Sequence, residues 1–433
     1  MSDSEIKLGW QKKLGYGSGD FGLNLFWQTI GFYLFFYYTE VIQISPSLVG
    51  VIFIIAGIWD AISDPIAGYV TERTKTKWGS YRPYLLFGSI PLAISFVLLF
   101  HPINIETPVL LMFYMTGILL FFRTCYTFVS IAYSALSARI IPAGSERIKL
   151  ISVRMYCGFL GGMAVTAIAG FLQEEYPDNV AFSLLSILCG IIAGLVLLIC
   201  FKTTHESERI NKSDRPALSY HEMKATLLRN RAFVAVTLGI FMITIANSFI
   251  GTGLLYYFEY VHHDRLAGNS AIFLMIGTPL VTIPIWSYLA VKIGYNKTWK
   301  IGSSVATIGI LSLLLHHDST LISVAKFGLI AFGLSSFAVL FWNMLPDSID
   351  YGEQKTGVRN EASIIGLASS SQKISIAFAG FIFGILLDWI GVGGTANEVS
   401  LSTSSQLIYI LTIIPAISLI ISVFVIKLYP KQI

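Results

Sequence analysis

The chain has 433 residues, of which 55% are hydrophobic and only 12% are charged, and its formal net charge at pH 7 is +4. A soluble domain typically has about a quarter charged residues, so this composition indicates a protein that crosses a membrane many times. The small positive charge gives no reason to expect a nucleic-acid partner.

Apolar stretches long enough to cross a bilayer recur along the whole chain. A helical span needs about 20 mostly apolar residues, and the period is helical, unlike the short alternating segments of an outer-membrane barrel. The stretches that meet this requirement are 14–41, 45–70, 81–101, 107–135, 150–172, 180–201, 231–260, 266–290, 298–315, 320–346, 362–388 and 404–428. The sequence therefore predicts an all-α membrane protein with twelve transmembrane helices.

A polar stretch near the middle of the chain divides these spans six and six. We expect an N-terminal six-helix half (1–201), a central cytosolic loop (202–230) and a C-terminal six-helix half (231–433). This is the plan of the major facilitator fold, whose halves move around a site near mid-membrane. No loop is long enough for a soluble catalytic domain.

Lys and Arg are distributed unevenly between the predicted loops. If the N-terminus is cytosolic, 24 of the 29 basic residues lie on the inner side and only Arg265 lies in an outer loop. Basic residues concentrate on the cytosolic side, so we expect a bacterial-type inner membrane with both termini in the cytosol. The start, MSDSEIKLGWQKK, has no signal-peptide core. The 4 cysteines lack metal-ligand spacing, so we expect no cofactor.

Two aspartates interrupt an apolar stretch, AGIWDAISDP (56–65). Asp60 and Asp64 are four residues apart, so they share one helix face with Cβ atoms about 5–6 Å apart. Ionisable groups at mid-bilayer are costly, and two like charges repel unless a cation lies between them. With the hydroxyl of Ser63, the pair suits Na⁺ or H⁺. The alternative is a structural pair, salt-bridged to an arginine or reached by cytosolic water.

Amide side chains mark a second polar group. Asn24 and Gln28 are one turn apart in the first span, and Asn247 lies in the seventh beside Thr244 and Ser248. Amides both donate and accept hydrogen bonds, which suits the vicinal hydroxyls of a sugar. Alone, each of these residues could equally stabilise contacts between helices.

Basic residues at membrane depth need partners. Lys373 and Arg154 each require a protein carboxylate or an anionic group on the substrate. Charged residues closer to the ends of predicted spans are expected to snorkel to the interface instead. These are Asp20, Glu259 and Lys326.

Three stretches carry more specific motifs: KLGYGSGDFGLN, IWDAISDPIAGYVTERTKTKWGSYRPYLLFG and LPDSIDYGEQKTGVRNEAS. They resemble the glycoside–pentoside–hexuronide:cation symporters, the melibiose-permease group of the major facilitator superfamily. The likeness covers nearly the whole chain. It implies a secondary transporter that imports a sugar or glycoside by symport with Na⁺ or H⁺, without covalent chemistry.

The resemblance also assigns roles to the cation-site residues. Asp60, Ser63 and Asp64 fall where this family binds its coupling cation, and Thr127 matches a hydroxyl ligand there. Arg123, one turn before Thr127, departs from the family, which usually has a small residue at this position. If Arg123 reaches an aspartate, it could replace Na⁺ as a built-in counterion, and coupling would be to H⁺ or absent. Otherwise it snorkels or lines the cavity.

The substrate positions depart from the melibiose type. Melibiose-type members hold sugar hydroxyls with two carboxylates, and the matching positions here are the neutral Asn24 and Ser130. Arg154 matches an arginine implicated in sugar binding, and Lys373 matches a lysine near the centre of the cavity. Trp342 stands as in glucuronide- and sulfosugar-type members. This pattern suggests an anionic glycoside such as a hexuronide, with a neutral sugar as the alternative.

Charges on the predicted inner loops form a further group. Ion pairs between the halves that exist only when the inside is shut would bias the two states of a carrier. The residues expected to form this inner gate are Arg73, Lys75, Lys77, Asp347, Asp350, Glu353 and Arg359. The alternative is that they are solvated connector charges.

Two further functions fit the same architecture. A lysolipid carrier would need an apolar slot, and the Asn24/Gln28 stripe weighs against it. A sugar sensor that does not transport is the other. An enzyme is disfavoured because no nucleophile–base or metal constellation is visible. The expected partners are a small sugar or glycoside, a coupling cation and the lipid bilayer.

Overall fold

The protein is almost entirely helical in the computed structural model, which describes residues 8–101, 105, 107–140, 145–206, 230–315, 319–356, 361–393 and 401–430. The helices before residue 206 are α1 (Trp10–Thr29), α2 (Pro46–Arg73), α3 (Arg82–Leu99), α4 (Pro108–Ile140), α5 (Ser145–Glu175) and α6 (Asp178–Thr203). Two π-helical segments, η1 (Ile30–Leu34) and η2 (Tyr37–Val41), extend α1.

The later helices follow the same pattern. They are α8 (Arg231–Tyr257), α9 (Arg265–Ile293), α10 (Tyr295–Ser312), α11 (Thr320–Thr356), α12 (Glu361–Trp389) and α13 (Leu401–Val425). A π-helical turn, η3 (Phe258–His262), follows α8, and a 3₁₀ turn, η4 (Ile426–Leu428), follows α13. Each predicted span coincides with one of these helices to within a few residues, except at the end of α11, so the all-α, twelve-helix prediction is confirmed.

The end of α11 corrects one prediction. The sequence placed Asp347, Asp350 and Glu353 in a loop after a span ending at residue 346, but α11 continues through Pro346 to Thr356. A proline removes only one backbone donor and kinks a helix without necessarily ending it. The three acidic residues therefore lie on the last turns of a long helix.

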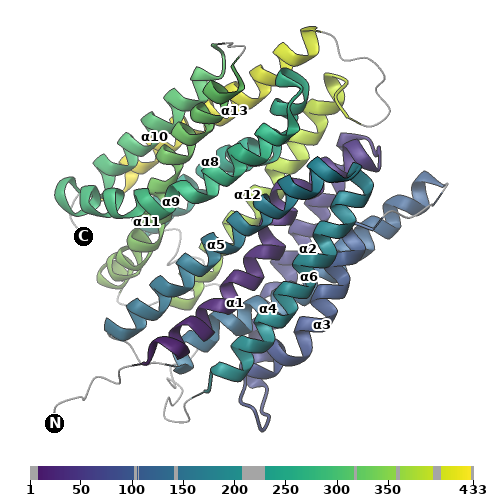
Figure 1. Ribbon diagram of the computed structural model, residues 1–433. Coiled ribbons are helices and arrows are strands. Elements are labelled where there is room, and N and C mark those ends of the chain that lie inside the picture. The colour runs from purple at the N-terminus through teal and green to yellow at the C-terminus, as the bar shows by residue number, and fades with distance from the viewer. Residues whose placement is uncertain are drawn as a thin grey trace, which may run out of the picture. The chain divides into compact units, whose positions relative to one another are not determined.

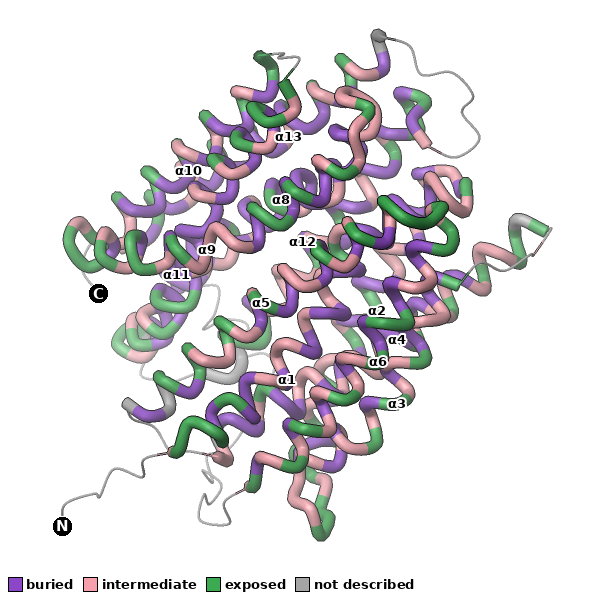
Figure 2. Tube along the Cα trace, in the orientation of Figure 1, coloured by how far each residue is buried: buried purple, intermediate pink, exposed green. Residues whose placement is uncertain are grey.

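Length and composition support membrane spanning. Within the described residues, 10 helices are long and apolar enough to cross a bilayer, and α1 and α10 are not among them. The first turns of α1 carry Lys12 and Lys13, and α10 begins with a polar stretch that includes Lys297. The helices also present large apolar side chains outward, such as Phe113 and Leu321. Figure 2 shows buried and exposed faces alternating along each helix, as amphipathic packing requires.

The described chain forms two compact units. One unit comprises residues Met1–Ile42 and Ile58–Ser213, and the other comprises Gln43–Gly57 and Asp214–Ile433. In the first unit α1 packs on α5 and α6, while α3 packs on both α4 and α6 (Figure 1). In the second unit α11 packs on α9 and α10, and α8 packs on α12 and α13.

The helix α2 contributes to both units. Its first half, up to Gly57, groups with the second unit, and the remainder, from Ile58, groups with the first. Glycines let the first half approach α12 closely: a Cβ added at Gly50 would lie 3.0 Å from Cα of Phe381. The second half carries Asp60 and Asp64, so the predicted cation residues belong to the first unit.

Glycine also sets the approach of α1 to α5. A Cβ added at Gly161 of α5 would lie 2.5 Å from the carbonyl oxygen of Phe21 in α1. Small residues at such contacts allow backbones of membrane helices to pack tightly. This close contact brings the polar residues of α1 against those of α5.

Candidate functional site

An ion pair joins the predicted cation residues on α2 to the arginine on α4. Nη1 of Arg123 donates to Oδ2 of Asp60 at 3.1 Å, and the two side chains are only 9% and 3% exposed. Two charges buried this deeply are tolerated because each compensates the other. Arg123 was expected either to reach an aspartate or to snorkel or line the cavity. The structure places it against Asp60.

The second aspartate has a different partner. Oγ1 of Thr127 donates to Oδ1 of Asp64 at 3.0 Å. The hydroxyl of Ser63 is buried and has no hydrogen-bond partner among the residues that the structure describes. Two carboxylates and two hydroxyls therefore gather between α2 and α4, and they are the oxygen ligands that a hard cation prefers.

Aromatic rings connect this acidic group to α1. The guanidinium of Arg123 lies over the ring of Trp27, with 5.2 Å from Cζ to the ring centroid. Trp27 in turn stacks on Tyr126, with ring centroids 5.4 Å apart. A cation over an indole face is attracted by the ring quadrupole, by about 2 kcal/mol or more when both are desolvated. Asp60 and Trp27 thus both hold the Arg123 guanidinium.

The polar residues of α1 form a second group with α5. Oδ1 of Asp20 accepts a hydrogen bond from Nε of Arg154 at 2.9 Å. The amide of Asn24 lies 3.5 Å from the other Asp20 oxygen, and the Gln28 amide lies 3.5 Å from Oδ1 of Asn24. The Arg154 guanidinium also lies 5.0 Å from the centroid of the Tyr133 ring. A continuous polar row therefore runs from Gln28 to Arg154.

The role of Asp20 differs from the sequence interpretation. It was expected to snorkel near the end of a helix, but only 14% of its side chain is exposed and it pairs with Arg154. Gly158 makes room for this arrangement, because a Cβ there would lie 2.5 Å from the Asp20 carboxylate and 2.8 Å from the Asn24 amide. One feature of the sequence pointed to Asp20 as part of this polar group: it lies one turn before Asn24, on the helix face that also carries Gln28.

The Asp20 pair changes the electrostatics of the substrate positions. The sequence left open whether Arg154 meets a protein carboxylate or an anionic group on the substrate, and only the second alternative favours an acid sugar. The carboxylate 2.9 Å away offsets this charge within the first unit. Ser130, at a position that carries a carboxylate in melibiose-type relatives, donates to the carbonyl of Thr127 at 3.4 Å.

The remaining predicted substrate residues belong to the second unit. Asn247 is exposed on α8, Trp342 is exposed on α11, and Lys373 is half-buried on α12. The ring of Trp342 packs edge-on against Phe341, with centroids 5.0 Å apart. These three residues are not brought into one group by the contacts described within that unit.

The predicted gate residues are dispersed over both units. Arg73 ends α2 and stacks on Tyr69, with 3.9 Å from Cζ to the ring centroid. Asp347, Asp350 and Glu353 line the last turns of α11. Arg359 lies outside the described residues.

Glu259, also expected to snorkel, pairs instead with Arg265: its Oε2 lies 2.7 Å from Nε of that arginine. The ammonium of Lys326 reaches the carbonyl of Leu315 at 2.5 Å, which is how a lysine at a helix end is satisfied.

Comparison with known proteins agrees with this architecture. A family model described as "MFS/sugar transport protein" matches residues 15–431. The chain is 29% identical over 386 residues to an isoprimeverose transporter of Lactiplantibacillus pentosus, covering 87% of this chain and 80% of that protein. It is 26% identical over 402 residues to a glucuronide carrier protein homolog of Escherichia coli, covering 91% of this chain and 86% of that protein.

A solved structure shares the fold. The xylose transporter XylE from E. coli, in a partially occluded inward-open conformation, superposes with a TM-score of 0.63 at 17% sequence identity, covering 98% of this chain and 97% of that one. The family model spans all the helices that carry the Asp60–Arg123 and Asp20–Arg154 pairs. The chain is therefore a multi-pass membrane protein of the MFS/sugar transport family, within the glycoside–pentoside–hexuronide:cation symporter group of the major facilitator superfamily.

Proposed function

We propose that this protein imports a sugar or glycoside across a bacterial inner membrane by symport with a cation. Family membership supports sugar transport as the class of activity. The observation that carries the coupling is the group formed by buried Asp60, Arg123 and Thr127 with half-buried Asp64, because three of these four side chains are ionisable and lie on apolar helices. Ionisable residues within membrane helices are rare and mark ion pathways and proton relays.

Arg123 determines which cation couples. A guanidinium 3.1 Å from Oδ2 of Asp60 supplies one positive charge at the place where a symporter would need Na⁺. A second cation beside it would meet electrostatic repulsion of about 3 kcal/mol at 5 Å in a medium of effective dielectric about 20. We therefore propose that transport is independent of Na⁺ and that a proton gradient drives it. Asp64, hydrogen-bonded to Thr127, is the carboxyl that would carry the proton.

Proteoliposomes with imposed gradients test this coupling. The wild-type protein should accumulate substrate with a proton gradient and should not respond to a Na⁺ gradient. Arg123→Gly opens the space beside Asp60 and should make uptake rise with external Na⁺. Arg123→Lys keeps the positive charge and should remain independent of Na⁺. Na⁺-stimulated uptake by the wild-type protein, or no gain of Na⁺ dependence in Arg123→Gly, would contradict the proposal.

The sugar is proposed to bind along the polar row of the first unit. Hydrogen-bond acceptors and donors follow one another along this row, and this suits the adjacent hydroxyl groups of a sugar. They belong to Asp20, Asn24, Gln28 and Arg154. Because Asp20 offsets Arg154, this row favours neutral hydroxyls over an anionic group. Parallel uptake of a labelled glucuronide and a labelled neutral galactoside distinguishes the two. Uptake of the galactoside alone would end the hexuronide hypothesis.

A further inference from the structure

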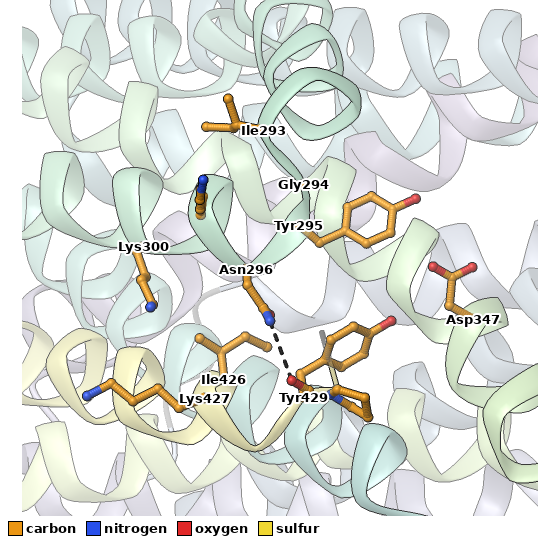
Figure 3. A pocket seen from close by; sticks show the side chains of 11 residues that line it. Ile293, Gly294, Tyr295, Asn296, Lys300, Asp347, Ile426, Lys427 and Tyr429 are labelled. Carbon is orange, nitrogen blue, oxygen red and sulfur yellow. Dashed lines mark hydrogen bonds between the residues drawn. The ribbon is translucent and has the colours of Figure 1, made fainter. Parts of the chain in front are cut away.

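A pocket of about 530 Å³ lies within the second unit, and none of the residues assigned above to sugar and cation line it. It is lined by the end of α9 at Ile293 and Gly294, by the first turns of α10, by Asp347 of α11 and by the chain after α13 (Figure 3). Its volume is in the range of sites that hold small molecules, about 300–1,000 Å³. It is larger than a single inorganic ion needs.

Positive charge dominates the lining. Three ammonium groups belong to the lining, those of Lys297, Lys300 and Lys427. Among the described lining residues, the one carboxylate is that of Asp347. Figure 3 shows Lys300 and Lys427 at one end of the pocket, with Asp347 and the rings of Tyr295 and Tyr429 at the other. The pocket therefore has a cationic end and an end rich in hydroxyl and carboxyl groups.

The start of α10 adds to the cationic end. Its N-cap is Gly294, with φ of 84° and no side chain to cap the first N–H groups of the helix. Uncapped N–H groups and the helix dipole both favour an anion at this place. The backbone thus reinforces the attraction of the three lysines.

Two buried polar atoms in the pocket lining have no hydrogen-bond partner among the described residues. Tyr429 is 5% exposed, and its hydroxyl has no hydrogen-bond partner among the described residues. Oδ1 of Asn296 is likewise unsatisfied within the described chain, although its Nδ2 donates to the Tyr429 carbonyl at 3.4 Å. Buried polar groups are rarely left unpaired unless a ligand or water completes them.

The phenol groups of Tyr295 and Tyr429, at the end of the pocket near Asp347, are neutral hydrogen-bond donors. Burial raises the pKa of Tyr295, and the nearby charge of Asp347 raises it further. The pKa of Tyr429 is raised by burial first and then by Asp347 and Tyr295. Both hydroxyls therefore keep their protons at physiological pH and can donate to a ligand oxygen.

We propose that this pocket binds a phosphorylated polyol. Its phosphate would lie among Lys297, Lys300, Lys427 and the start of α10, because phosphate is the anion that several ammonium groups and helix N–H groups hold together. Its hydroxyls would meet Asp347 and the phenols of Tyr295 and Tyr429. The chemistry is shared by soluble sugar phosphates and by the glycerol phosphate headgroup of anionic phospholipids.

Binding to the full-length protein in phosphatidylcholine nanodiscs tests the proposal. Glucose 6-phosphate and glycerol 1-phosphate, titrated by calorimetry, should bind saturably and at least about tenfold more tightly than inorganic phosphate. Lys300→Gln combined with Lys427→Gln should weaken this binding by about tenfold or more, since charge-assisted contacts are lost. Lys292→Gln is the control, because Lys292 lies over the ring of Tyr288 at 5.4 Å and does not line the pocket.

Phosphatidylglycerol nanodiscs distinguish the two sources. If the lipid headgroup is the natural ligand, these nanodiscs should abolish binding of the soluble probes, and if a soluble metabolite is the ligand, binding should be equal in both lipids. Tyr429→Phe removes only the unpaired hydroxyl and should weaken the polyol phosphates but not inorganic phosphate. No saturable binding in phosphatidylcholine, or binding that the lysine substitutions leave unchanged while Tm is preserved, would overturn the proposal.

Discussion

Asp60 and Arg123 face each other from α2 and α4, with 3.1 Å between Oδ2 and Nη1 and both side chains more than nine-tenths buried. The pair supplies charge balance where neither residue could be charged alone. Removing either partner therefore leaves the other as an uncompensated buried charge.

Asp60→Asn should destabilise the protein by about 3–5 kcal/mol, because it leaves the buried Arg123 guanidinium uncompensated. Thermal unfolding, followed by labelling of the buried cysteines Cys189 and Cys200, reports this change. Combining Asp60→Asn with Arg123→Met should recover most of the loss, since the unpaired charge is gone. A double variant as unstable as Asp60→Asn would show that the ion pair is not the cause.

Asp20→Asn should shift substrate preference toward anionic glycosides. It removes the carboxylate 2.9 Å from Nε of Arg154 and leaves the guanidinium with its full charge. A unit charge about 5 Å from a substrate carboxylate contributes on the order of 3 kcal/mol at an effective dielectric of about 20. The ratio of glucuronide to galactoside uptake should therefore rise at least about tenfold.

The matched control for this experiment is Glu174→Gln. Glu174 is an exposed carboxylate near the end of α5, the same helix that carries Arg154. Its removal changes net charge by the same amount and should leave the uptake ratio unchanged. Equal shifts in both variants would mean that overall charge, and not the Asp20–Arg154 pair, determines preference.

Gly161→Ala should weaken the packing of α1 on α5. The added methyl would lie 2.5 Å from the Phe21 carbonyl oxygen, so the helices must separate, at about 1–3 kcal/mol as in other overpacked cores. Gly117→Ala in α4 meets no atom within 4 Å and should leave Tm unchanged or slightly raised, because alanine favours helix. Unfolding midpoints of the two variants, measured side by side, check this contrast.

Glu146, at the start of α5, gives the protein a dependence on acidic pH. Lys13 and Lys149 each lie 2.8 Å from its carboxylate, and their hydrogen bonds lower its pKa from 4.5 to about 2. A lowered carboxyl pKa stabilises the folded state above the ordinary value, and the stabilisation is lost as pH falls toward the lowered one. The Tm difference between wild type and Glu146→Gln should be constant from pH 7 to about 5 and shrink below that. A difference that is as large at pH 3 as at pH 7 would contradict this assignment.

The fold was largely predictable, because hydropathy alone locates helices that must satisfy every backbone group internally. The departures have local causes. The continuation of α11 past Pro346 was missed because acidic residues after a proline are typical of a loop, while the structure keeps them helical. The π-helical segments of the first span, η1 and η2, leave no pattern in hydropathy.

The site was predictable only where partners are close in sequence. Asp60 and Asp64 stood out because their spacing places both on one helix face. Asp20 was misjudged because its partner Arg154 is 134 residues away, and no periodicity reveals how α1 and α5 align. The sequence could offer the Arg123–Asp60 contact only as one possibility. The two positions are 63 residues apart, and the packing of α2 and α4 decides whether they meet.

The two sets of contacts that α2 makes meet within one turn of the helix. Residues up to Gly57 pack with α12, whereas Asp60, three positions later, is bonded to α4. Gly57 and Ile58 are consecutive residues of one continuous helix, so no loop separates the residues that pack on α12 from those that hold the Arg123 pair. The buried ion pair and the close helix contact at Gly57 therefore depend on the same turn of α2.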